Sequence, residues 1–92
     1  MRKFVKKIEV KDITKMTDYE INKLECGDLV VKITVEGQRE LRHTYVVSYK
    51  ENNQGICLSY SACGYLETVA YDFNAETGHW VYNSTDVWQA QQ

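Results

Sequence analysis

The residues of this chain that could do the most varied chemistry are three cysteines and two histidines: Cys26, Cys57, Cys63, His43 and His79. Thiolate and imidazole groups are good zinc ligands, but no two of these residues stand at the short spacing with which one local segment supplies two ligands. A cysteine nucleophile needs a histidine base beside it, and the best candidate is Cys63 in a predicted turn, with His43 or His79 as the base. Nothing in the sequence brings these side chains together, so we expect no metal, no cofactor and no catalytic activity.

Tyrosine and acidic residues distinguish the second half of the chain from the first. Residues 1–50 hold all 11 lysines and arginines, whereas the charged residues of 51–92 are all acidic. Tyrosine is enriched at interfaces because it offers a large contact area at low entropic cost, and acidic groups around it steer a basic partner. We therefore predict a binding surface made of five residues: Tyr60, Tyr65, Glu67, Asp72 and Trp88.

The leading hypothesis is a non-catalytic protein-binding module whose partner has a basic surface. A short chain of this kind would suit a phage or mobile-element inhibitor of a host protein, such as one that occupies the basic groove of a nucleic-acid enzyme. Self-association into a homo-oligomer is compatible with the same surface. Four other tyrosines are predicted to fill the core of the sheet instead: Tyr45, Tyr49, Tyr71 and Tyr82.

Two alternatives of other classes remain open. One is a small-ligand-binding barrel, as a monomer or a dimer, with a mouth lined by Tyr60, Tyr65 and a histidine. An interior filled by side chains would exclude this reading, and the side chains expected there are Tyr45, Leu58, Val69 and Trp80.

The other alternative is single-stranded nucleic-acid binding, in which bases stack on tyrosine rings. Such binding needs a basic groove beside the rings, because phosphate contacts supply most of the affinity. The aromatic half of the chain carries no lysine or arginine, and Arg39, Arg42 and His43 form only a small basic cluster. This mismatch disfavours nucleic acid as the partner.

Length and composition predict one domain in a reducing compartment. Ninety-two residues cannot hold two cores, and a hydrophobic content of 43% is enough for one. No stretch approaches the roughly 18 apolar residues needed to cross a bilayer. The basic N-terminus is followed by no apolar run, unlike a secretory signal, and an odd number of cysteines suits the cytoplasm.

A capping box gives the clearest local signal. Thr17 and Glu20 stand three residues apart, so each side chain can bond the other's backbone amide and begin a helix. We expect one short helix over about 18–26, ended by Gly27 in a left-handed conformation. A strand is predicted before it over 4–10, where Phe4, Ile8 and Val10 share a face.

From Leu29 onward the hydrophobic period changes to two, as expected for half-buried strands. In the first of these strands the side chains of Leu29, Val31, Ile33 and Val35 are expected to turn inward together. Asn74 and Gly78 predict a tight turn that sets Phe73 opposite Trp80 and Tyr71 opposite Tyr82.

The fold class predicted from this pattern is mainly β: a six-stranded antiparallel meander, as a curled sheet or small barrel, over residues 1–83 with a tail at 84–92. The basic first strand is expected beside an acidic C-terminal strand, where its lysines would offset Glu67 or Asp72.

Overall fold

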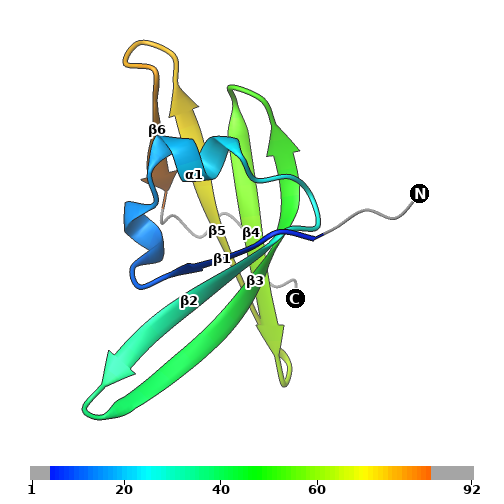
Figure 1. Ribbon diagram of the computed structural model, residues 1–92. Coiled ribbons are helices and arrows are strands. Elements are labelled where there is room, and N and C mark those ends of the chain that lie inside the picture. Colours follow the sequence, from blue (N-terminus) through cyan, green and yellow to red (C-terminus); the bar gives the residue numbers. More distant parts are fainter. Residues whose placement is uncertain (1–4, 84–92) are drawn as a thin grey trace.

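The computed structural model describes residues 5–83, which form one curled sheet covered by two short helical segments (Figure 1). The six strands lie in the sheet in chain order, so the predicted mainly β architecture is confirmed. The sheet stays open as a half-barrel. The elements are β1 (Lys7–Val10), the 3-10 helix η1 (Ile13–Lys15), α1 (Asp18–Asn22), β2 (Leu29–Glu36), β3 (Arg39–Glu51), β4 (Gly55–Ala62), β5 (Tyr65–Asn74) and β6 (His79–Asn83).

β1 departs from the antiparallel pattern. It runs parallel to β2, with Ile8 opposite Val30, while every later pair is antiparallel. The connection through residues 11–28, which contains η1 and α1, is long enough for the crossover that a parallel pair requires. The prediction that this strand lies beside an acidic C-terminal strand is therefore wrong. Its Glu9 instead meets Arg42 of β3, at 3.0 Å between Oε2 and Nη1.

A β-bulge at Ser48 divides β3 into two parts. The register with β4 shifts between Val47 and Tyr49, and an extra residue in one strand reverses which side chains face inward. Before the bulge, Tyr45 and Val47 are buried; after it, Tyr49 is 47% exposed. The expectation that Tyr49 belongs to the core is therefore wrong. A strict period of two cannot hold across an inserted residue.

The side chains of β2 that were predicted to turn inward, which include Val31 and Ile33, lie on the face away from the central core cluster. Val30, opposite Tyr45, enters the central core cluster, and alternate residues such as Val31 and Ile33 point away from it. Val31 and Ile33 are nevertheless buried, whereas Val35 is exposed. Because β2 carries apolar residues on both faces, the alternation alone did not select the inner one.

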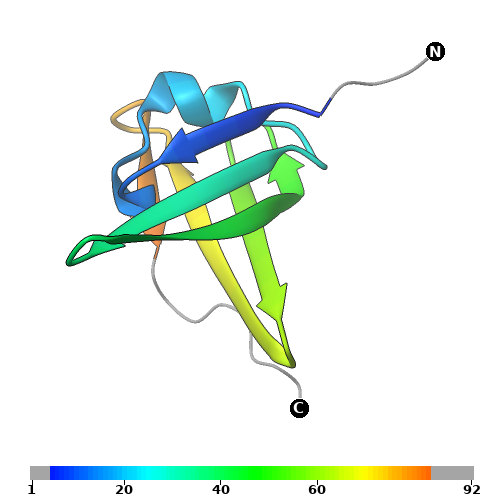
Figure 2. The same cartoon turned by 60° about the horizontal axis from the view of Figure 1, so that its bottom comes forward.

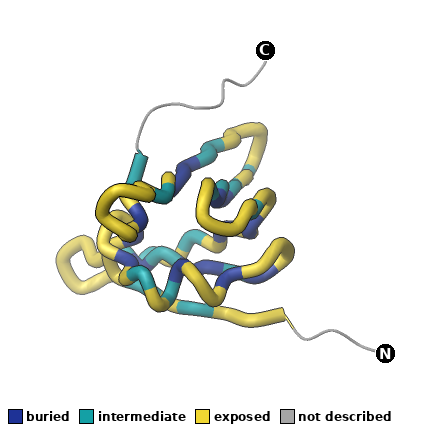
Figure 3. The backbone as a smooth tube through the Cα atoms, turned by 90° about the horizontal axis from the view of Figure 1, so that it is seen from above, coloured by how far each residue is buried: buried dark blue, intermediate teal, exposed yellow. Residues whose placement is uncertain are grey.

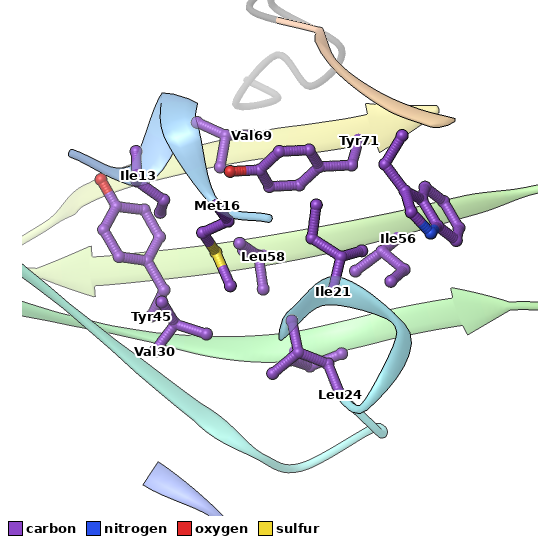
Figure 4. Close-up of a cluster of buried hydrophobic side chains, with 12 residues drawn as sticks. Ile13, Met16, Ile21, Leu24, Val30, Tyr45, Ile56, Leu58, Val69 and Tyr71 are labelled. Carbon is purple, nitrogen blue, oxygen red and sulfur yellow. The ribbon is translucent and has the colours of Figure 1, made fainter. Parts of the chain in front are cut away.

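The core lies between the curled sheet and the two helical segments (Figure 4). Ile13 and Met16, with Ile21 and Leu24, pack onto the inner face of the strands. Figure 3 shows the buried segments gathered inside the curl and the exposed loops around it. Four side chains that were expected to fill the interior are buried there: Tyr45, Leu58, Val69 and Trp80. This filled interior argues against a ligand-binding barrel.

The predicted capping box begins α1. The Thr17 amide donates to Glu20 Oε1 at 2.9 Å, and the Glu20 amide donates to Thr17 Oγ1 at 3.2 Å. The helix is shorter than expected, because it ends at Asn22. Gly27 has the expected left-handed φ of +94°, but it lies in the loop that leads to β2.

The last hairpin has the predicted register. Phe73 lies opposite Trp80 and Tyr71 opposite Tyr82, with ring centroids 5.2 Å and 5.4 Å apart. Asn74 organises the turn, since its Oδ1 accepts the Glu76 amide at 2.9 Å.

Candidate binding surface between two hairpins

The β2–β3 and β4–β5 hairpins diverge below the core (Figures 1 and 2). β3 pairs with β2 over Arg39–Val46, but it meets β4 only from Val46, opposite Ser59, onward. Beyond that point each hairpin continues alone to its own tip. The inner faces of the two hairpins therefore bring side chains together from segments far apart in the sequence.

Four rings meet at the divergence and form what we call the aromatic cluster: His43, Tyr45, Tyr60 and Tyr65. Tyr60 is at its centre, with its ring centroid 5.0 Å from His43, 5.4 Å from Tyr45 and 6.3 Å from Tyr65. These spacings lie within the range of favourable aromatic pairs, and most of the rings meet edge to face. The cluster thus joins β3 to the β4–β5 hairpin through side chains where the backbone pairing of β3 with β4 has stopped.

The cluster passes from the core to solvent in steps. Tyr45 is 2% exposed, Tyr60 and His43 are half-buried, and Tyr65 is 58% exposed. Each outer ring is therefore supported by the one beneath it. Aromatic side chains held in this way lose little conformational freedom when a partner covers them.

A carboxylate lies beside these rings. Glu67 of β5 is directly opposite Tyr60, on the same inner face, and its Oε1 accepts the Tyr45 hydroxyl at 2.9 Å. Burial and this hydrogen bond raise the pKa of Tyr45, so its hydroxyl stays protonated and holds the carboxylate in place. Burial also raises the pKa of Tyr82, and the negative charge of Glu67 raises it further.

The structure brings together three of the five residues predicted for the binding surface: Tyr60, Tyr65 and Glu67. Asp72 lies on the opposite face of β5, where its Oδ2 accepts the Asn83 side-chain amide at 2.9 Å. It borders a shallow hollow on that face, which is lined by Phe73, Asn74, Ala75, Glu76 and Val81. Trp88 lies outside the described residues.

Sequence reasoning left His43 and Tyr45 out of this surface. Their spacing of two placed both on one face of a strand, which was the available signal. Their contact with Tyr60 depends on where β3 leaves β4, and the position of the bulge sets that point. The sequence gives no periodic signal for the bulge.

The groups considered for catalysis or metal binding are separated. Within residues 5–83, no three histidine, cysteine or acidic side chains gather closely enough to hold a metal ion. The cysteines are free, and burial raises the pKa of Cys57. His79 Nδ1 lies 2.6 Å from Asp18 Oδ2, and the His43 ring packs against Tyr60. In this part of the chain neither histidine has a hydrogen bond to a thiol.

The small basic cluster is also divided. His43 is on the inner face of the β2–β3 hairpin and Arg42 on the outer face. The Arg42 guanidinium binds Glu9 and Glu40, and these contacts raise its pKa.

Lys32 of β2 lies directly opposite His43, and Arg39 shares the face of β3 that carries His43, so two basic side chains are on the inner face of this hairpin. The strands that carry Tyr60 and Tyr65 supply no lysine or arginine.

Neither of the described helical segments is long and apolar enough to cross a membrane. Comparison of the chain with family models, with curated proteins and with solved structures found no match.

Proposed function

We propose that this domain is a non-catalytic protein-binding module, and that its binding surface is the aromatic cluster together with Glu67. The partner presents a basic surface and meets the domain in the cytoplasm. One role that would use such a surface is that of a phage or mobile-element inhibitor, which occupies the basic groove of a host protein.

The observation that carries this proposal is the exposure of Tyr65 at the end of a supported row of rings. A ring 58% exposed, beside the half-buried Tyr60, can be covered by a partner without rearrangement of the domain. Tyrosines at the centre of an interface typically cost about 2 kcal/mol or more of binding free energy when they are truncated to alanine.

Charge gives independent support. Residues 51–83 contain no lysine or arginine, and of their acidic residues Glu67 lies on the proposed surface, whereas Asp72 is on the opposite face of β5. A surface of one sign speeds association with a partner of the other sign, and added salt weakens this effect.

The proposal is tested by capture experiments from a lysate of the source cell, with proteins quantified by mass spectrometry. The bait is the wild-type protein or the double variant Tyr60→Ala/Tyr65→Ala, and the control is Tyr49→Ala, which removes an exposed tyrosine elsewhere. We expect the double variant to lose at least roughly tenfold of the captured partner, the change that about 1.4 kcal/mol produces. Equal capture by all three baits, or no specific capture, would contradict the proposal.

Sedimentation of the purified protein distinguishes a foreign partner from a second copy. If the surface served only self-association, the wild-type protein would sediment as a dimer and the double variant as a monomer. A monomeric wild-type protein that still captures a partner is the result we expect.

A further inference from the structure

We infer that Tyr60, Tyr65 and Glu67 form a corner that holds one cationic side chain, a lysine or an arginine, of the partner protein. This inference rests on the proposed function and names the chemical group that the surface recognises.

The two rings have suitable geometry for a cation. Their planes are inclined by 63°, and their centroids are 6.3 Å apart, so they form two walls of a corner. Cations are attracted to the face of an aromatic ring when they lie within about 6 Å of its centroid. A single ammonium or guanidinium group between the rings can satisfy this distance for both. Tyr65, the more exposed wall, leaves the corner open to solvent.

Among residues 5–83, no counter-ion pairs with Glu67, the carboxylate opposite Tyr60. Glu67 Oε1 accepts a hydrogen bond from the Tyr45 hydroxyl. No other hydrogen bond or ion pair from residues 5–83 involves the Glu67 carboxylate. A carboxylate can accept several hydrogen bonds, so Glu67 retains the capacity to bind the N–H groups of a cation. The Tyr45 hydroxyl fixes its position before the cation arrives.

Three acidic groups in the first half of the chain differ in this respect. Glu9 and Glu40 both bind Arg42, and Asp28 lies 3.5 Å from the Lys6 ammonium. Glu67, in contrast, lies directly opposite Tyr60 and has no lysine or arginine partner among residues 5–83.

The same chain shows the proposed contact in another place. The Lys23 ammonium lies 4.6 Å from the centroid of the Tyr19 ring and donates to the Tyr19 hydroxyl at 2.9 Å. Over residues 5–83, no lysine or arginine lies over Tyr60 or Tyr65 in this way. A cation from a partner would complete that arrangement at the corner.

The test is a titration followed by amide chemical shifts, with N-acetyl-arginine methylamide as the probe. The matching N-acetyl-citrulline methylamide has nearly the same shape without the charge. We expect the arginine probe to shift the amides of Tyr60, Tyr65 and Glu67, with weaker shifts in high salt. The citrulline probe should leave these amides unchanged, and equal shifts from both probes would overturn the inference.

Three variants separate the roles of ring and charge. Glu67→Gln keeps the shape and removes the charge, and Tyr65→Leu keeps apolar area and removes the ring. Each should weaken binding of the arginine probe by about three- to tenfold, in keeping with one cation–π or charged contact. Tyr65→Phe should retain binding, as should the control Tyr49→Leu.

The same variants distinguish this inference from the proposed function. If Tyr60→Ala/Tyr65→Ala loses the partner while Glu67→Gln and Tyr65→Leu keep it, the surface binds protein but recognises no cation at the corner. If all of them keep the partner, both ideas fail.

Discussion

Asp28 shows how much one side chain can connect in a domain of this size. Its carboxylate is buried and accepts the backbone amide of Lys6 at 3.2 Å and that of Glu25 at 2.9 Å. The Lys6 ammonium lies 3.5 Å away. One carboxylate therefore joins the segment before β1, the loop after α1 and the start of β2.

We expect Asp28→Ala to lower the free energy of unfolding by about 1–3 kcal/mol, because two part-buried amides lose a charged acceptor. Burial alone would raise the pKa of Asp28, but the amides of Glu25 and Lys6 and the charge of Lys6 outweigh it and lower that pKa. A carboxyl with a lowered pKa in the folded state stabilises the fold above its unfolded pKa of about 4, and this contribution is lost as the pH falls through the folded value.

Urea denaturation between pH 2 and pH 7 measures both effects. The loss of stability in acid should be smaller in Asp28→Ala than in the wild-type protein, because the variant has already lost this contribution. Glu76→Gln, at an exposed turn position, is the control and should follow the wild-type profile. Parallel profiles for all three proteins would show that Asp28 carries no pH-dependent stability.

Tyr71 contrasts with Asp28, because its buried polar group is poorly satisfied by hydrogen bonds. Its side chain is 1% exposed, and among residues 5–83 its hydroxyl makes no hydrogen bond of standard geometry, although the nearby Met16 backbone amide offsets part of the rise that burial causes in the pKa of Tyr71. Tyr71→Phe should change the free energy of unfolding by less than about 1 kcal/mol or raise it, because no satisfied bond is lost. Tyr45→Phe is the matched comparison, since it loses the bond to Glu67 and should cost about 0.5–1.5 kcal/mol. Thermal or urea denaturation decides, and a larger loss in Tyr71→Phe than in Tyr45→Phe would contradict this view.

At the scale of elements, α1 depends on side chains from distant strands. Five residues are too few for a stable isolated helix. At its beginning, Asp18 Oδ1 accepts the Trp80 amide of β6 at 2.9 Å. At its end, the Lys50 ammonium donates to the carbonyls of Asn22 at 2.8 Å and Leu24 at 2.6 Å. Lys50 can reach them because the bulge at Ser48 turns it inward.

Lys50→Met should destabilise the domain by about 1–3 kcal/mol, since two carbonyls lose a charged donor near the negative end of the helix. Amides of α1 should also exchange faster with solvent. Lys11→Met changes an exposed lysine and serves as the control, with a change of less than about 0.5 kcal/mol. Equal stability of the two variants would show that the bulge does not position a cap for the helix.

The accuracy of sequence reasoning also varied at this scale, for reasons that particular residues show. Thr17 and Glu20 predicted where α1 begins, and Asn74 and Gly78 predicted the last turn, because these signals act over a few residues. The end of α1 depends on Lys50, 28 residues from Asn22, and local patterns carry no information about such a contact.

For the candidate surface, too, the sequence predicted the local groupings and missed the contacts between distant segments. Tyr60, Tyr65 and Glu67 could be grouped because they flank one turn. Asp72 was grouped with them by charge, although the alternation along β5 already separates it from Glu67. The contacts of His43 and Tyr45 of β3 with Tyr60 could be predicted only by knowing where the two hairpins diverge.

At the scale of the whole molecule, the divergence of the hairpins divides the domain by stability. In the described structure, one edge of β3 from Arg39 to Tyr45 pairs with β2 and the other pairs with no strand. Val47 and Leu58, by contrast, lie in the filled core. Amide exchange should therefore be fast from Glu36 to Glu40 through local opening, and limited by global unfolding at Val47 and Leu58. Uniform protection along β3 would contradict this division.

The parallel pairing of β1 also has a kinetic consequence. Each pair from β2 to β6 joins strands that follow one another through a short loop, whereas β1 pairs with β2 only after residues 11–28 are ordered. β1 should therefore dock after the rate-limiting step. In stopped-flow measurements, Ile8→Ala should speed unfolding and leave the folding rate nearly unchanged, while Leu58→Ala should also slow folding. A slower folding rate in Ile8→Ala would place β1 in the folding nucleus.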